Sequence, residues 1–148
     1  MKKFRSIAML LLFFNLTACS AVTSIKNYNR NEDCDKVLKA YRNMIRWNEA
    51  EKAAIAFVDK PLRDDYNKAA EQMRRRKVSM VDTRMLAQEC LANSKSAEAT
   101  IEFDYYIMPD VRLRTLTDRQ KWIFRESDSE RPELGDGWKL VSPLPDFK

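Results

Sequence analysis

The side chains of this chain that could do chemistry include three cysteines and no histidine. Without an imidazole, the chain cannot form a Ser-His-Asp or Cys-His catalytic set, nor a zinc site with histidine ligands. A cysteine in such a chain serves instead as an acylation point, as half of a disulfide or as a buried thiol. The surroundings of Cys19, Cys34 and Cys90 distinguish these roles, and we predict no catalytic residue and no metal site.

Cys19 follows a segment with the parts of a secretory signal. They are a basic start, an apolar run over residues 7–14 and the residues Leu16-Thr17-Ala18. The apolar run is shorter than the roughly 20 residues that cross a bilayer core, so a signal peptide is favoured over a transmembrane helix. The pattern resembles the lipobox of bacterial lipoproteins. That resemblance implies cleavage before Cys19, which would then carry diacylglycerol and a palmitate-type acyl chain.

The same resemblance implies where the protein resides. Ser20 is not the aspartate that retains lipoproteins at the inner membrane, so we expect a lipid anchor in the cell outer membrane and a domain facing the periplasm. The lipid on Cys19 is the only covalent group expected, and no cofactor is predicted. Removal of Lys2, Lys3 and Arg5 would leave 24 basic and 22 acidic side chains, a balance that argues against a nucleic-acid partner.

Cys34 and Cys90 remain after Cys19 is assigned to the lipid. Two cysteines in an oxidising compartment are most simply a disulfide, which would close a loop of about 55 residues. The alternative is a pair of unpaired buried thiols, since pairing depends on distance and direction.

The rest of the chain predicts one α+β domain with the helices first. Apolar residues that recur every three or four positions predict helices over residues 35–58 and 62–75. Alternation of apolar and polar residues predicts strands over 78–91, 99–107, 111–125 and 138–142. In the first strand, Val81, Thr83 and Met85 are expected to face the core. A bulge is expected near Leu116 to Asp118, where the alternation changes phase. The domains are therefore a signal peptide (1–18), a lipidated tether (19–33) and a single domain (34–148).

Several short motifs make this domain resemble the nuclear transport factor 2-like, or cystatin-like, fold of a group of small proteobacterial lipoproteins. They are Tyr41, Arg46-Trp47-Asn48, Tyr105-Tyr106, Gln120 with Trp122, and Gly137-Trp138-Lys139-Leu140. The resemblance implies a long helix and a second helix on a curved four-stranded antiparallel sheet, with a cone-shaped pocket between them. Enzymes of this fold place an aspartate in that pocket, whereas the alternation here puts Asp82 and Asp104 on the opposite face of the sheet.

Two groups of residues are candidate contact sites. The first group could line the cone, although aromatic side chains more often pack in the core. The second is a basic run that would contact the membrane, although basic residues also suit the C-terminus of a helix. The first group is Arg46, Trp47, Tyr105 and Trp122, and the second is Arg74, Arg75, Arg76 and Lys77.

We therefore expect a membrane-anchored periplasmic lipoprotein that acts as a non-catalytic binding or accessory component of the cell envelope, with an envelope protein as its partner. The alternative is a small-ligand carrier or an enzyme that uses the cone. A third possibility is a homodimer formed through the sheet.

Overall fold

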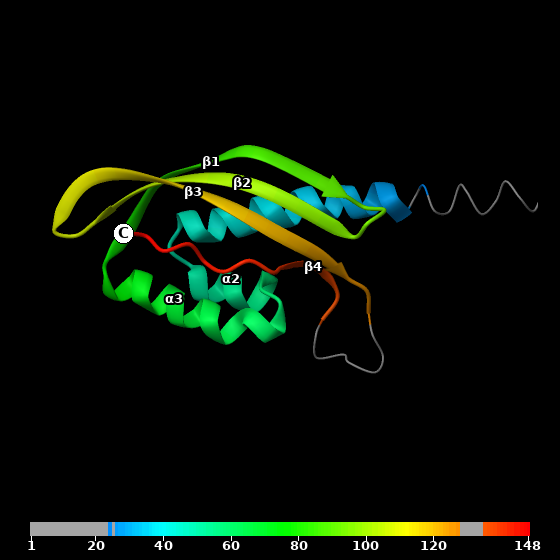
Figure 1. Cartoon of the computed structure of the whole chain (residues 1–148), viewed down its shortest axis with the longest axis horizontal. Coiled ribbons are helices and arrows are strands. Elements are labelled where there is room, and N and C mark those ends of the chain that lie inside the picture. The colour runs from blue at the N-terminus through cyan, green and yellow to red at the C-terminus, as the bar shows by residue number, and fades with distance from the viewer. Residues whose placement is uncertain (1–23, 25, 128–134) are drawn as a thin grey trace, which may run out of the picture.

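The computed structural model describes residues 24, 26–127 and 135–148. A long helix over residues 26–46 comes first and is followed by shorter helical segments. Four strands then form one antiparallel sheet in the order β1-β2-β3-β4. The segments are α2 (Ala50–Phe57), η1 (Lys60–Leu62), α3 (Arg63–Arg75), β1 (Val78–Leu91), β2 (Ser96–Ile107), β3 (Asp110–Arg125) and β4 (Gly137–Leu140). This arrangement confirms the predicted α+β fold with a long helix and a curved sheet (Figure 1).

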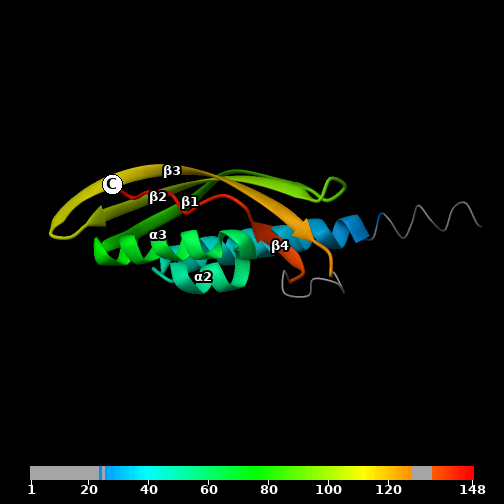
Figure 2. The same cartoon turned by 60° about the horizontal axis from the view of Figure 1, so that its bottom comes forward.

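The helices all lie on one face of the sheet, which we call the inner face (Figures 1 and 2). The other face, the outer face, carries no helix in either view. Antiparallel sheets commonly bury one face and leave the other in solvent, because hydrophobic and polar residues alternate along each strand. In β2, Ala97, Ala99, Ile101, Phe103 and Tyr105 follow this rule and are all buried.

The core fills the space between the inner face and the helices. Trp122 of β3 packs edge-on against Tyr41 of the long helix, with 5.3 Å between the ring centroids. Phe103 packs in the same way on Phe147 at the C-terminus, at 5.7 Å. Tyr41, Phe103 and Trp122 are each no more than 1% exposed. Large side chains therefore occupy the region where the sequence predicted a cone.

The tether predicted over residues 19–33 differs from the structure, because residues 26–33 already belong to the long helix. Contacts from the far end of the chain order this segment. Arg30 donates from Nη1 to the carbonyl of Ala92 at 2.9 Å, and its guanidinium lies 4.5 Å from the centroid of the Phe124 ring. Trp138 donates from Nε1 to the carbonyl of Arg30 at 3.0 Å. These contacts are made by polar groups, so the sequence shows no apolar periodicity there.

The single helix predicted over residues 35–58 is divided at residues 47–49. Asn48 has a φ of 57°, in the left-handed region that asparagine tolerates better than most residues. The amide of Glu49 donates to the carbonyl of Met44 at 2.8 Å, and that of Asn48 to Ile45 at 3.0 Å. These two bonds form a Schellman motif, which ends a helix without glycine or proline.

The prediction that Val81, Thr83 and Met85 of β1 face the core is correct only in part. Its register against β2 shifts between Met80 and Asp82 and again between Met85 and Ala87. Each bulge adds one residue and reverses the alternation, so Thr83 is buried while Val81 is 47% exposed. No sequence signal marked either bulge.

The bulge predicted near Leu116 to Asp118 is wrong. Pairing of β2 with β3 is regular from Ser96↔Ile123 to Tyr105↔Arg114, and the shift falls after Tyr105. The phase change has another cause, which is that the apolar residues at the start of β3 face outward. Val111 is 71% exposed and Leu113 is 59% exposed.

Candidate functional site

Cys34 and Cys90 form the expected disulfide, with their Cα atoms 6.3 Å apart. The bridge joins the long helix to β1. Twelve residues further along the helix, Arg46 pairs through Nη1 with Oδ1 of Asp82 on the same strand, at 3.3 Å. β1 is an edge strand of the sheet, and the helix is thus tied to it at two points. Such cover protects an exposed strand edge from pairing with other chains.

Arg46 and Trp47 do not lie where a pocket lining was predicted. The helix ends at residue 46, so Arg46 reaches outward to the edge of the sheet and its side chain is 46% exposed. Trp47 belongs to the turn that follows and is 73% exposed. The Schellman turn directs both residues out of the core, which the continuous helix of the prediction did not allow.

Tyr105 and Trp122 do face the interior, as predicted, and both are buried. Tyr105 donates its hydroxyl to the carbonyl of Lys148 at 2.7 Å and packs on Phe147, so it holds the C-terminal segment on the sheet. Trp122 donates from Nε1 to Oε1 of Gln120 at 3.3 Å. Each side chain therefore has a structural role in the core.

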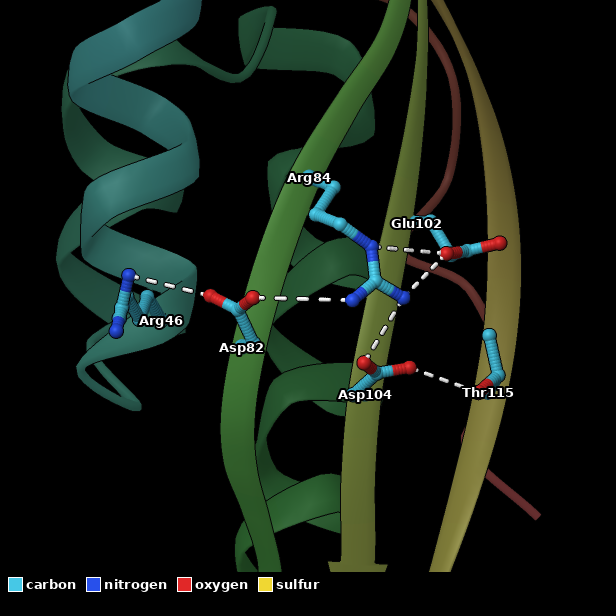
Figure 3. A network of polar contacts seen from close by, with 6 residues as sticks. All are labelled: Arg46, Asp82, Arg84, Glu102, Asp104 and Thr115. Atoms are coloured by element: carbon cyan, nitrogen blue, oxygen red, sulfur yellow. Dashed lines mark hydrogen bonds and ion pairs between the residues drawn. The ribbon is translucent and has the colours of Figure 1, made fainter.

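A charged cluster crosses the outer face, and Figure 3 shows it from close by. Arg84 lies at its centre. Its Nη2 is 2.9 Å from Oδ2 of Asp104, and its Nε donates to Oε1 of Glu102 at 3.1 Å. Its Nη1 is 3.8 Å from Asp82. Thr115 donates to Oδ1 of Asp104 at 2.7 Å. The pKa of Arg84 is raised, first by the hydrogen bond to Glu102 and then by the charge of Asp104.

This cluster has a structural explanation. Asp82 and Asp104 are directly opposite one another in the ladder, and like charges in that position are destabilising. Arg84 lies between the carboxylates and offsets their repulsion. The outward placement of Asp82 and Asp104 agrees with the sequence expectation, since both carboxylates engage groups on the outer face rather than in the core.

A second polar cluster lies in the core, and sequence reasoning missed it. Asp118 of β3 is 8% exposed and accepts a hydrogen bond from Nε2 of Gln120 at 2.8 Å. Burial raises the pKa of the Asp118 carboxyl, and the bond from Gln120 offsets only part of that rise. Gln120 in turn accepts from Trp122, so three residues of one strand form a chain of hydrogen bonds.

Two tyrosine hydroxyls complete the interior set. Tyr41 and Tyr66 are 2.7 Å apart at their hydroxyl oxygens, and both side chains are buried. Burial is the main cause that raises the pKa of each phenol, and the negative charge of Asp118 adds to it. The cluster therefore resembles a general acid site in composition: a buried carboxyl and paired phenols. The signal for it was the inward phase of residues 118, 120 and 122, which the expected bulge concealed.

The basic run lies at the end of α3 and its charges are largely paired. Arg74 is 3.8 Å from Glu51, Arg75 bonds Glu71 from Nε at 3.0 Å, and Arg76 reaches Asp146 at 3.0 Å. Lys77 has a φ of 56° and ends the helix, with its amide bonded to the carbonyl of Arg74. The run therefore has a structural role at a helix C-terminus, and it lies at the opposite end of the molecule from residue 26 (Figure 1).

Three clefts at the surface bear on access to the interior cluster. One of about 460 Å³ separates the long helix from the ends of β3 and β4 and includes Lys36, Phe124 and Trp138. Another of about 400 Å³ lies on the sheet by Leu91 and Ile123 and is bordered by Trp122 of the cluster, and one of about 230 Å³ lies between α2 and α3. Tyr41, Tyr66 and Asp118 line none of these three clefts.

Two further observations concern the part of the chain that the structure describes. It contains no helix that is both long and apolar enough to cross a membrane. Nor do its cysteines and carboxylates gather into a group that could hold a metal ion. Cys19, the predicted lipidation site, and the predicted signal peptide before it lie outside the described residues.

Comparisons with known proteins find a distant likeness in structure. No family model matches the chain, and no curated protein matches its sequence. Among solved structures, the chain is similar to the intermembrane space region of the chloroplast protein ARC6, at 10% sequence identity and a TM-score of 0.46. The match covers 74% of this chain and 90% of that one.

Proposed function

We propose that this chain is a lipoprotein anchored in the outer membrane through Cys19, and that its periplasmic domain acts by binding another component of the cell envelope. In this proposal the domain belongs to the nuclear transport factor 2-like group and performs no reaction of its own. The observation that supports binding is the contrast between a filled interior and an open surface. Tyr41, Phe103 and Trp122 are at most 1% exposed, whereas no helix within the described residues covers the outer face of the sheet.

The contrast matters because a reaction or a carried ligand needs a space to occupy. Ligand sites are concave and bury most of the molecule they hold. A binding protein can instead use its exposed surface, where apolar side chains mark contact regions. Val111 and Leu113 at the start of β3 are such side chains.

A small-ligand carrier or enzyme is the second candidate, and the buried Asp118 favours it. A carboxyl with a raised pKa beside two phenols is the kind of group that exchanges protons with a bound molecule. This candidate requires the side chains around Asp118 to separate and admit a ligand.

Anchoring is tested by metabolic labelling with radioactive palmitate in the native cell. The wild-type chain should incorporate label and fractionate with the outer membrane, and Cys19→Ser should do neither. Label on the Cys19→Ser chain, or none on the wild type, would contradict the anchor.

The choice between binding and chemistry is tested with two isosteric variants, Asp118→Asn and Tyr66→Phe. The binding proposal expects the detergent-extracted chain to migrate as part of a complex larger than the single cleaved and lipidated chain, and expects both variants to do the same. A complex of two copies of that chain would identify a homodimer. If the variants fold but lose a bound small molecule that the wild type retains, the second candidate is correct.

A further inference from the structure

The β2–β3 hairpin projects past the helices at the end of the molecule opposite residue 26 (Figures 1 and 2). Its turn and the first residues of β3 form what we call the distal tip, which comprises Met108, Val111, Arg112 and Leu113. Met108 is 46% exposed, Val111 71% and Leu113 59%. Three large apolar side chains so exposed in one short segment mark an interaction site rather than scattered surface residues.

The tip is also cationic. The carboxylate of Asp110 is engaged within the hairpin, since it accepts from the amide of Arg112 at 3.0 Å and from Nη2 of Arg114 at 3.1 Å. The guanidinium of Arg112 has no ion-pair partner among the described residues, and neither has the ammonium of Lys77, whose carbonyl accepts from the amide of Met108. The amide of Arg112, and after it the charges of Arg112 and Arg114, lower the pKa of the Asp110 carboxyl, so this one carboxylate offsets only part of the positive charge. The tip therefore offers apolar contacts beside a net positive charge.

The position of the tip relative to the anchor restricts what it can meet. The N-terminal end of the long helix lies beside the turn between β1 and β2, where Asn27 bonds to Asn93 and Arg30 to the carbonyl of Ala92. The tip is separated from that end by the length of β3, which is roughly 50 Å for 16 residues. A chain anchored through Cys19 thus extends the tip away from its own bilayer.

We propose that the distal tip inserts into an apolar pocket flanked by carboxylates on a partner protein of the envelope. This inference rests on the proposed anchoring and names the surface and the partner chemistry. Met and Arg, unlike Lys, are enriched where proteins meet, and convex anchors of this kind fill pockets on the partner. The tip presents Met108 and Arg112 together.

A second copy of the chain does not fit the tip. Two tips brought together would place their Arg112 side chains near one another, and like charges in contact are repulsive.

The test is photocrosslinking in the native cell with the full chain. Val111 is replaced by benzoylphenylalanine, and Leu91 is replaced in the same way as a control. Leu91 is 46% exposed but lies at the anchor end of the sheet. We expect Val111 to yield one discrete protein adduct that maps to a segment with Asp or Glu beside apolar residues, and Leu91 to yield none.

Charge dependence is tested with Arg112→Glu and the matched variant Arg119→Glu on the same strand. Arg119 is exposed and forms no ion pair within the described part of the chain. Arg112→Glu should reduce the Val111 adduct at least five-fold, and Arg119→Glu should leave it unchanged. The inference is overturned by a phospholipid adduct alone, by an adduct with a second copy, by no adduct, or by equal effects of the two variants.

The two proposals fail in distinguishable ways. If the chain carries no palmitate at Cys19 but still forms the Val111 adduct, the proposed lipid anchor is wrong and the proposed binding role of the distal tip is supported. If the chain is labelled with palmitate but forms no adduct, the lipid anchor is supported and the binding role of the distal tip is wrong.

Discussion

The disulfide between Cys34 and Cys90 offers a direct test of how the long helix is held. The perturbation is the double variant Cys34→Ala/Cys90→Ala, in the chain from Ser20 onward. Crosslinking two residues 56 positions apart removes loop-closure entropy from the unfolded chain, which the entropy model values at about 4 kcal/mol. Alanine is chosen because Cys34 is 1% exposed, and a small apolar replacement leaves no polar group buried there.

The assay is urea unfolding followed by circular dichroism, with and without a reductant. The double variant should lose about 4 kcal/mol of unfolding free energy. The urea dependence should steepen, because an unfolded chain without the crosslink exposes more surface. In a thermal scan the midpoint should fall by roughly 15 °C. Reduction should lower the wild type to the level of the variant and should not change the variant.

A loss below about 1 kcal/mol would refute this reasoning. It would mean that the unfolded chain keeps the helix near β1 even without the bridge, so the crosslink removes little entropy. The pair formed by Arg46 and Asp82 would not explain such a result, since both side chains are more than 40% exposed and surface pairs contribute little.

Three further predictions concern the polar clusters. Burial raises the pKa of Asp118, so the folded state binds its proton more readily than the unfolded state and wild-type stability falls as pH rises through the folded pKa. Asp118→Asn should therefore be the more stable protein at pH 7 in urea unfolding, with an advantage that shrinks toward pH 4; an advantage that grows on acidification would contradict the assignment. Tyr66→Phe should cost about 1–2 kcal/mol because Tyr41 loses its partner, whereas Tyr41→Phe/Tyr66→Phe should cost less than the sum of the single changes in a double-mutant cycle. Thr115→Val should cost about 1 kcal/mol more than the control Thr117→Val in the same assay, since only Thr115 donates to Asp104; equal costs would show that this bond adds no stability.

The order of elements could be predicted from the sequence because it depends on local patterns. Proline at position 61 separated the two predicted helices, and the change of period after Lys77 separated helices from strands; in the structure α3 follows Pro61 and β1 begins at Val78. The disulfide was predictable in part, since only two cysteines remained to pair once Cys19 was assigned to the lipid. The outward placement of Asp104 followed from the alternation of β2 alone.

Register and burial could not be predicted, because they depend on residues distant in the chain. The bulges of β1 follow from its fit to β2 and to the helices, and they alone expose Val81. The inward phase of Asp118 could be read from the alternation with Gln120 and Trp122, but its neighbours Tyr41 and Tyr66 come from helices distant in the chain, and only the tertiary structure brings them to β3. Val111 and Leu113 are apolar in the sequence whether they face the core or solvent. Only the tertiary structure shows that their part of the hairpin extends beyond the helices, so that nothing in the fold covers them.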